Sequence, residues 1–406
     1  MAGGWSGLAE NRRVDSIMRK PCNKPLAARS HPCPNPDIGL TFGEGALEIS
    51  SAALSVVDPG SFEPRARKGE GADMVIQACR WTHPIRGIRA VAALPFWGCL
   101  IAAGCVGPRP GTPHERHGEE IVACGRFFHT GAPVVLWLDP CGYDAYRVEC
   151  RFTPDRALPA DAVHADSPAR YGSFRRHMPP DDTAAVRENG WELEMLRKHV
   201  DLFVLHYDAC GTSRRCFKVL HDVRGLSVHF LLDVDGTIYQ TLDLKERAWH
   251  AGPANDRSIG IEIANMGAYE DRAKLDAWYS RNAQGRVFFE PPLTDGRTGI
   301  RTPEFVAYPA QNEAVRGRIH NRDLWQYDLT DAQYDSLTKL VAALTRVLPR
   351  IRPDAPRRPT GEIRADALTP DELARFSGIV GHYHITESKV DPGPAFDWAR
   401  VLPGSR

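Results

Sequence analysis

Apolar and polar residues alternate along two stretches of the C-terminal half, with the period of two that is typical of a β-strand. Residues 201–207 read DLFVLHY, which places His206 on the same face as two aliphatic side chains. Residues 258–265 read SIGIEIAN, so that the isoleucines face one way and Glu262 faces the other way between two small residues. Such a carboxylate fits a core poorly, and the pattern predicts that Glu262 forms the floor of a site.

Two further strand-like runs, at 226–233 and 237–242, flank the dipeptide Asp235-Gly236, which is a strong signal for a β-hairpin.

Two helices are predicted downstream. Thr330 begins the first with a capping box, and Thr369 begins the second with proline at the first helical position. The run GIVGHYHI that follows is interpreted as a final strand. Strands separated by helices indicate an α/β fold, a mixed central β-sheet flanked by helices.

The N-terminal part of the chain has a different character. Residues 1–73 mix Gly, Pro, Ser and Arg without periodicity, which predicts a disordered or non-native extension. In residues 119–151 short apolar runs alternate with Gly and Pro, and a Pro- and Ala-rich stretch follows. We therefore expect a small N-terminal β-rich extension and linker over 106–180, and the main domain over 181–402.

Residues 90–106 contain no charge and read AVAALPFWGCLIAAGCV, which is short for a membrane-spanning helix of about 20 residues. Arginines precede this run, Met74 offers an alternative start of translation, and the end of the run resembles a bacterial lipobox at Cys105. The pattern predicts a lipoprotein-type signal over 74–105 and a lipid anchor at Cys105. The protein would then lie in the cell envelope, in the periplasm or at the outer membrane. A buried helix or strand in a cytoplasmic protein is the alternative.

The amino-acid composition indicates which classes of partner to expect. The 406 residues are 42% hydrophobic and 25% charged, as in an ordinary soluble protein, and Lys+Arg and Asp+Glu both number 51. This balance gives no sign of a nucleic-acid partner. Ten cysteines are present, but none forms a CxxC pair, so a zinc knuckle is not expected.

A catalytic metal is the chemistry that the polar residues favour. The HExxH signature of many metalloproteases is absent. The stretch 381–394 reads GHYHITESKVDPGP and supplies His382 and Asp391. Together with His206 they make up the two-histidine, one-carboxylate set that recurs in catalytic zinc sites. Lys389 lies two residues before Asp391, so in extended chain both side chains point at the same site.

From about residue 201 to residue 400 the chain resembles the zinc amidase family of AmpD-type enzymes, phage lysozyme-type amidases and peptidoglycan recognition proteins. Five motifs in family order carry the resemblance: VLH at 204–206, SVHFLLDVDGTIYQ at 227–240, RAWHAG at 247–252, NDRSIGIEI at 255–263 and GHYHITESKVDPGPAFDW at 381–398. The resemblance implies the fold of those proteins and a zinc-dependent N-acetylmuramoyl-L-alanine amidase. Such an enzyme cuts the amide bond between the muramic acid lactyl group and L-alanine in peptidoglycan or muropeptides.

The resemblance also implies roles for single residues. His206, His382 and Asp391 match the three zinc ligands of the AmpD branch. Lys389 matches the lysine that steadies the oxyanion, and Glu262 matches the glutamate taken to transfer the proton. These five residues are the predicted catalytic constellation.

Several assignments stay open. His384 lies on the same expected strand face as the second histidine ligand and competes with it, although we favour a supporting role. Trp249 and His250 either line a substrate groove or only support the framework, and we predict substrate binding. Cys210 and Cys216 are expected to form a disulfide if the protein is exported, with free thiols as the alternative.

The stretch 266–328 is long for a connection and rich in aromatic residues, which is typical of a functional cover. Its aromatic side chains would contact glycan or stem peptide, or else pack the insertion against the domain. The rival function is a non-catalytic peptidoglycan-binding module of the same fold. Loss of a zinc ligand would be the sign of such a module, and all three ligands are present.

Overall fold

The computed structural model describes residue 111 and residues 116–147, 149–152, 163–164, 167–168 and 171–402. The predictions for residues 1–73 and 74–105, including the lipid anchor at Cys105, fall outside the described residues.

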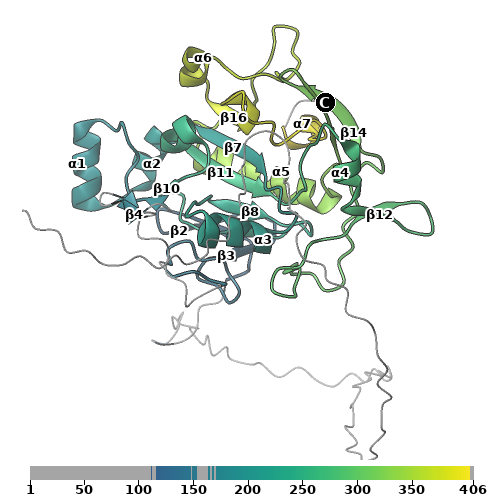
Figure 1. The fold of residues 1–406 in the computed structure, drawn as a ribbon. Coiled ribbons are helices and arrows are strands. Elements are labelled where there is room, and N and C mark those ends of the chain that lie inside the picture. The colour runs from purple at the N-terminus through teal and green to yellow at the C-terminus, as the bar shows by residue number, and fades with distance from the viewer. Residues whose placement is uncertain are drawn as a thin grey trace, which may run out of the picture. The chain divides into compact units, whose positions relative to one another are not determined.

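A six-stranded mixed sheet lies at the centre of the described chain (Figure 1). Its strands follow the order β16-β7-β11-β8-β9-β3. Their bounds are β3 (Val134–Leu136), β7 (Leu202–Tyr207), β8 (Phe230–Leu232), β9 (Ile238–Gln240), β11 (Ser258–Ile263) and β16 (Gly378–Gly381). The first four in this order run parallel, whereas β9 is antiparallel to β8 and parallel to β3. This sheet, with its helices, confirms the expected α/β fold.

Helices α5 (Asp331–Val347) and α2 (Leu193–His199) pack on one face of the sheet. The predicted capping box at Thr330 begins α5. Apolar side chains of both helices share one buried cluster with Phe203 of β7 and Ile261 of β11. Each such side chain contributes roughly 1.5–3 kcal/mol when fully buried. Because side chains alternate along a strand, this packing leaves the neighbours of these residues on the opposite face.

The predicted hairpin connects β8 and β9, and its turn packs on the start of α5. Gly236 has a φ of 81°, and a Cβ there would come within 2.7 Å of the carbonyl oxygen of Ala332. The hydroxyl of Thr330 donates to the carbonyl of Val234 at 2.7 Å. Only glycine therefore fits the turn, and the hairpin and the helix cap fix each other.

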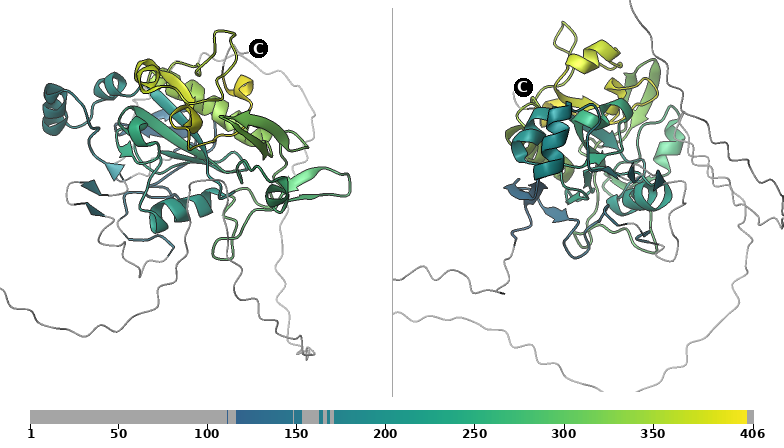
Figure 2. Two further views of the ribbon diagram at one scale, coloured as in Figure 1. Left: turned by 45° about the horizontal axis from the view of Figure 1, so that its top comes forward. Right: turned by 90° about the vertical axis from the view of Figure 1, so that its left-hand side faces the viewer.

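The remaining elements are short. The helices and helical turns are α1 (Pro180–Asn189), α3 (Ser213–Phe217), a π-helical turn (Lys218–Val223), a 3-10 turn (Gly252–Arg257), α4 (Arg272–Asp276), α6 (Pro370–Arg375), a second 3-10 turn (His382–His384) and α7 (Trp398–Val401). The strand pairs are β1 (Glu120–Ala123) with β2 (Arg126–His129), β4 (Val163–His164) with β5 (Ser167–Pro168), β6 (Tyr171–Gly172) with β10 (Arg247–Ala248), β12 (Tyr279–Arg281) with β13 (Val287–Phe289), and β14 (Val315–Ile319) with β15 (Arg322–Gln326). In Figures 1 and 2 the loop between β12 and β13 extends away from the central sheet.

The expected N-terminal β-rich extension shares a core with the main domain. β1 and β2 form a hairpin, β3 joins the central sheet beside β9, and Ile121 of β1 lies in the same buried cluster as the sheet. Arg175, within the expected linker, is buried, and its guanidinium donates to the carbonyls of Leu244 and Glu246 at 2.9 Å. The apolar runs of the extension are therefore buried against the main domain.

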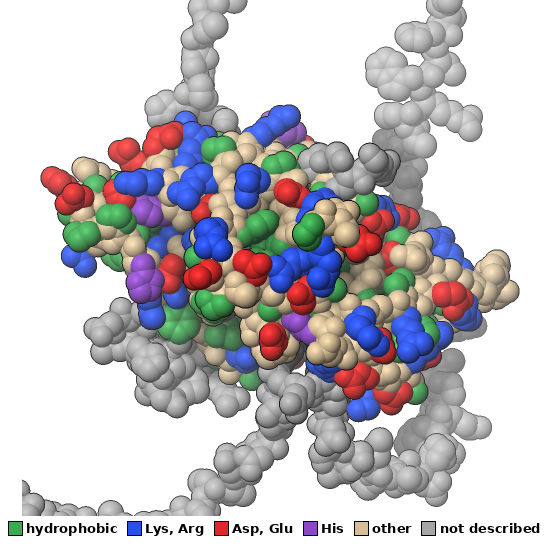
Figure 3. Space-filling view, turned by 90° about the horizontal axis from the view of Figure 1, so that it is seen from above, with side chains coloured by type: hydrophobic (Ala, Val, Ile, Leu, Met, Phe, Trp, Pro, Cys, Tyr) green, Lys and Arg blue, Asp and Glu red, His purple; other side chains and the backbone are tan. Residues whose placement is uncertain are grey.

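The surface carries charges of both signs. On the face shown in Figure 3, basic and acidic side chains are intermixed, with apolar side chains between them. Within the described residues, no helix combines the length and the apolar character needed to cross a membrane.

Candidate metal centre

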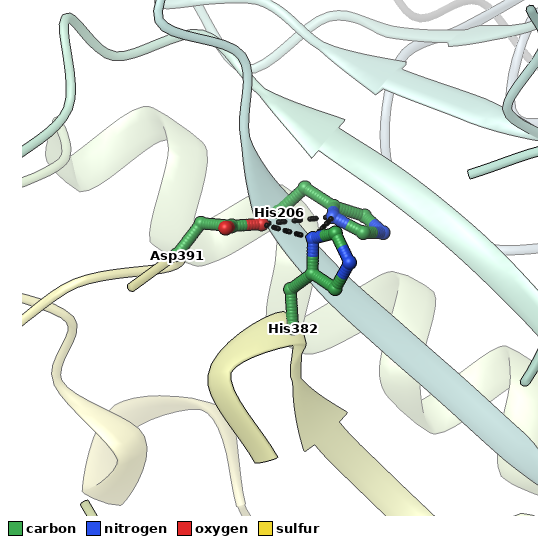
Figure 4. Close-up of side chains that lie close together, drawn as sticks. All are labelled: His206, His382 and Asp391. Carbon is green, nitrogen blue, oxygen red and sulfur yellow. Dashed lines mark hydrogen bonds and ion pairs between the residues drawn. The ribbon is translucent and has the colours of Figure 1, made fainter. Parts of the chain in front are cut away.

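Two neighbouring parallel strands bring two histidines together. His206 lies near the end of β7, and His382 is the first residue after β16, which pairs with β7. Since the carboxyl ends of parallel strands meet at one edge of a sheet, both imidazoles arrive at the same place. Asp391 reaches them from the loop that follows the 3-10 turn (Figure 4).

Three potential ligand atoms converge at this place. Asp391 Oδ2 lies 2.8 Å from His206 Nδ1 and 3.0 Å from His382 Nδ1, and the two nitrogens are 3.0 Å apart. All three residues are buried. Without a cation, hydrogen bonds cannot satisfy all three of these atoms at once. Two protonated nitrogens would point N–H groups at each other, and an unprotonated nitrogen would turn its lone pair toward the carboxylate.

The donor set therefore fits a cation, and its chemistry suits zinc. Two imidazole nitrogens and one carboxylate oxygen form a recurrent catalytic zinc set that leaves a fourth position for water. His206, His382 and Asp391 are the residues that would hold the ion. Within the described part of the chain, no other group of three or more His, Cys, Asp or Glu side chains is placed to bind a metal.

The charges at this site are arranged for a cation. Burial opposes the ionisation of Asp391, but the two imidazoles beside it outweigh burial and hold the pKa of Asp391 well below its ordinary value. Burial, together with the nearby His382, lowers the pKa of His206 to about 4. At neutral pH the site thus presents an ionised carboxylate and a neutral imidazole at His206, which are the protonation states that metal ligands need.

Glu262 lies on the next strand, beside the three converging residues. β11 pairs with β7 in parallel, with Glu262 opposite His206, so both side chains project from the same face of the sheet. Burial and the negative charge of Asp391 raise the pKa of Glu262 well above its ordinary value. The positive charge of Lys389 opposes this rise in the pKa of Glu262, and it also lowers the pKa of His206. The ammonium of Lys389 is therefore close enough to influence both groups.

His384 is not one of the converging residues. The predicted final strand ends at Gly381, and His382–His384 form a 3-10 turn, so the expectation that His384 shares a strand face with His382 is wrong. The turn directs His384 toward the backbone: its Nδ1 accepts from the Gly381 N–H at 3.0 Å, and its Nε2 donates to the carbonyl of Arg364 at 2.8 Å. Burial lowers the pKa of His384 to about 3, so this histidine is a neutral structural residue.

Trp249 and His250, predicted to bind substrate, both contact the protein framework. The Trp249 ring lies under the guanidinium groups of Arg247 and Arg176, whose central carbons are 5.5 and 6.0 Å from the ring centroid. His250 Nδ1 lies 3.0 Å from His206 Nε2. His250 therefore contacts a predicted zinc ligand, and its role in substrate binding stays a prediction.

The insertion at 266–328 supports the loop that carries Lys389 and Asp391. His320, in the turn between β14 and β15, donates from Nε2 to the carbonyl of Lys389 at 2.9 Å. Gln326 of β15 donates to the carbonyl of Pro392 at 2.9 Å and accepts from the N–H of Ala395 at 3.0 Å. These contacts join residues more than 60 positions apart in the sequence, and no local pattern pointed to His320 or Gln326.

The aromatic residues of the insertion mostly pack it to the domain. Phe289 and Tyr327 are buried in one apolar cluster, with Trp278, Tyr279 and Trp325 partly buried against it. The rings of Tyr279 and Tyr327 have centroids only 4.0 Å apart. Packing is thus the alternative that the structure supports for these side chains.

The expected disulfide between Cys210 and Cys216 is not formed. Both cysteines are buried free thiols, and a hydrogen bond between their side chains is one cause that raises the pKa of Cys216, after burial. Cys216 lies on α3, the short helix that begins at Ser213. The contact is close, yet the two sulfurs stay unbonded.

Comparison with known proteins agrees with this geometry. Residues 196–394 match the family model of N-acetylmuramoyl-L-alanine amidases. The matched segment contains the three converging residues, together with Glu262 and Lys389.

Residues 196–394 belong to the N-acetylmuramoyl-L-alanine amidase family.

Individual relatives of this amidase domain are distant. The 1,6-anhydro-N-acetylmuramyl-L-alanine amidase AmpD of Escherichia coli K12 is 27% identical over 183 residues, which are 43% of this chain and 56% of AmpD. The match thus spans little more than half of that relative's length. A crystal structure of AmpD has 23% identity and a TM-score of 0.27, covering 60% of this chain and 94% of that chain. The E. coli amidase AmiD, solved with a muropeptide substrate, has 21% identity and a TM-score of 0.26, covering 50% of this chain and 56% of that chain.

Proposed function

We propose that the protein is a zinc-dependent amidase that hydrolyses the bond between the muramic acid lactyl group and L-alanine in peptidoglycan or muropeptides. The observation that carries the proposal is the convergence of His206, His382 and Asp391, with Glu262 in register beside His206. Membership of the amidase family supports the substrate class. AmpD, one of the proteins that the chain resembles, is named as a 1,6-anhydro-N-acetylmuramyl-L-alanine amidase.

The residues around the metal centre have complementary tasks in such a reaction. When bound, a zinc ion supplies polarisation of the scissile carbonyl and acidifies a water molecule. Glu262 takes a proton from the attacking water and delivers it to the departing L-alanine nitrogen, which is otherwise a poor leaving group. Lys389 offsets the negative charge that develops on the carbonyl oxygen. The C–N bond breaks as the new C–O bond forms, leaving a lactyl carboxylate and a peptide with a free amine.

A mass-resolved assay tests the proposed activity. The zinc-loaded full chain is incubated with purified muropeptides, with His206→Ala as the matched control. We expect a peptide that begins with L-alanine and a saccharide with a free lactyl carboxylate from the wild type, and intact muropeptide from the control. Binding of muropeptides without release of peptide would support the rival, a non-catalytic binding module, and contradict the proposal.

We also propose that a lipid anchor at Cys105 holds the protein in the cell envelope. The support is the charge-free run that ends in Ala-Ala-Gly-Cys at 102–105, preceded by arginines. An insoluble wall polymer suits a tethered enzyme, and the several acyl chains of a bacterial lipoprotein bind a membrane firmly. Cell fractionation should place the wild type with membranes and release Cys105→Ala. A cytosolic wild type, or membrane association that is unchanged in Cys105→Ala, would contradict the anchor.

A further inference from the structure

His250 contacts His206 on the side opposite the converging ligand atoms. His206 Nδ1 faces Asp391 and His382, whereas its other ring nitrogen, Nε2, lies 3.0 Å from His250 Nδ1. The two rings meet edge to face, with centroids 5.2 Å apart. Both nitrogens of His206 are thus engaged, one toward the metal centre and one toward His250.

The ring of His250 is itself held by its surroundings. Its Nε2 lies 3.3 Å from the hydroxyl of Ser258, and its backbone N–H donates to Asn255 Oδ1 at 3.1 Å. One face of the ring lies against Gly260, where a Cβ would come within 2.5 Å of the imidazole. Only glycine at this position leaves room for the ring. His250 is therefore fixed in one orientation, with each ring nitrogen beside a protein group.

One arrangement of protons satisfies the whole chain of contacts. A histidine that offers its Nδ1 lone pair to a metal keeps its proton on Nε2. The Nε2–H of His206 can then donate to Nδ1 of His250, which must be the acceptor. His250 in turn carries its proton on Nε2 and donates to the hydroxyl of Ser258. In this arrangement each of the two hydrogen bonds joins one donor to one acceptor.

We propose that His250 is a positioning residue that fixes the tautomer and the ring orientation of His206 as a metal ligand. This inference rests on the proposed metal centre and deepens it. Metal-binding histidines usually donate their second N–H to a carboxylate, a carbonyl or water, and loss of that partner typically weakens metal binding 10–100-fold. Here the partner is a neutral imidazole, which orients His206 without bringing a further negative charge to the site.

Zinc affinity in two matched variants tests the role of His250. His250→Phe keeps an aromatic ring against Gly260 but removes the acceptor, whereas His250→Asn places Oδ1 close to the position of Nδ1. Competition with a chromophoric chelator should show about 10–100-fold weaker zinc binding in His250→Phe, and recovery of most of that loss in His250→Asn. His221→Phe is the control, because His221 is also a buried histidine but is bonded to Asp222 and to the carbonyl of Arg147 and stacks on Phe217 rather than on His206 or His250. It should bind zinc as the wild type does.

Nitrogen-15 NMR of the zinc-loaded wild type provides a readout that needs no variant. It should show His206 and His250 both protonated on Nε2, with the His206 proton exchanging slowly. Wild-type zinc affinity in a folded His250→Phe, equal losses in both His250 variants, or a proton on Nδ1 of His250 would each overturn the inference. If His250→Phe does not fold, as judged by circular dichroism, the His250→Asn affinity and the NMR tautomers decide. A wild type that binds no zinc would instead overturn the metal centre itself.

Discussion

Two carboxylates reach the same face of the sheet from different regions, and their surroundings act on them in opposite directions. Asp391, on the C-terminal loop, lies 2.8 and 3.0 Å from two imidazole nitrogens, and its pKa is held well below the ordinary value. Glu262, on β11, is subject to burial and to the negative charge of Asp391, and its pKa is raised. Both are acidic residues near His206, yet their surroundings lower the pKa of Asp391 and raise the pKa of Glu262.

This difference fits the separate roles that we propose for the two carboxylates. A group that stays ionised at all relevant pH values suits a metal ligand, because no proton competes with the cation. A group whose pKa is raised suits proton transfer, because it accepts a proton more readily than an ordinary carboxylate and can then return it. Environments that push the pKa values of two neighbouring acids apart are a general sign of distinct catalytic roles.

Loss of Asp391 should have the largest effect. Asp391→Ala removes one of three ligands and leaves only the two imidazoles, so we expect zinc affinity to fall by more than about 100-fold, beyond the range for an outer partner. Turnover should fall with it. Metal content after dialysis, measured by mass spectrometry of the elements, checks the prediction. Full zinc occupancy in Asp391→Ala would show that the comparison is wrong.

Glu262→Gln should separate metal binding from chemistry. The amide keeps the size of the side chain but cannot accept the water proton, so turnover should fall by about 10²–10⁴-fold while zinc stays bound. Steady-state kinetics and metal content on the same preparation provide the two readouts. Turnover close to wild type in a zinc-loaded Glu262→Gln would rule out the proton-transfer role.

Lys389→Ala should act on the transition state with a smaller effect. Removing one group that stabilises the oxyanion typically lowers kcat by about 10²–10³-fold, and zinc should remain bound because Lys389 is not among the converging ligands. Lys389→Arg keeps the positive charge and serves as the control, with partial activity expected. Equal loss of zinc and turnover in Lys389→Ala would mean that Lys389 only holds the loop of Asp391.

A third carboxylate, that of the buried Asp233, extends the comparison to stability. Burial, followed by the charge of Asp235, raises the pKa of Asp233 to about 8. Because the folded pKa lies above the unfolded value of about 3.9, the stability contributed by Asp233 is present below about pH 4 and is lost as pH rises toward 8. The slope is at most about 1.4 kcal/mol per pH unit for one proton.

Asp233→Asn should flatten this pH dependence. The amide can keep the contact in which Asp233 Oδ1 accepts from the N–H of Val234 at 2.9 Å, but it does not titrate. Urea unfolding of the metal-free protein between pH 5 and pH 8 measures the effect. A wild type that gains stability over this range relative to Asp233→Asn would contradict the sign.

The sequence predicted the parts of the site that depend on strand periodicity. Alternation predicted that His206 shares a strand face with two aliphatic residues and that Glu262 lies between two small ones, and the structure puts the two residues opposite each other in register. The position of His384 was wrong because a 3-10 turn replaces the end of the last strand, and a period of two does not reveal where a strand stops. The contact between His206 of β7 and His250, which follows β10, joins residues 44 positions apart, and no local pattern specifies it.

The same limit applies to the fold. The mixed sheet and both capped helices follow from local patterns, such as the capping box at Thr330. The pairing of β3 with β9 and the support of the Lys389 loop by His320 join segments that are distant in the sequence. Such pairings are selected by complementary surfaces in the folded chain, so they became visible only in the structure.

Anomalous scattering at the zinc edge, from crystals of the zinc-loaded protein, tests the division between the two carboxylates most directly. The account predicts one strong peak bound by His206, His382 and Asp391, with Glu262 beside the ion but outside its ligand set. A peak at which Glu262 or His384 takes the place of Asp391, or the absence of a peak at this face of the sheet, would contradict it.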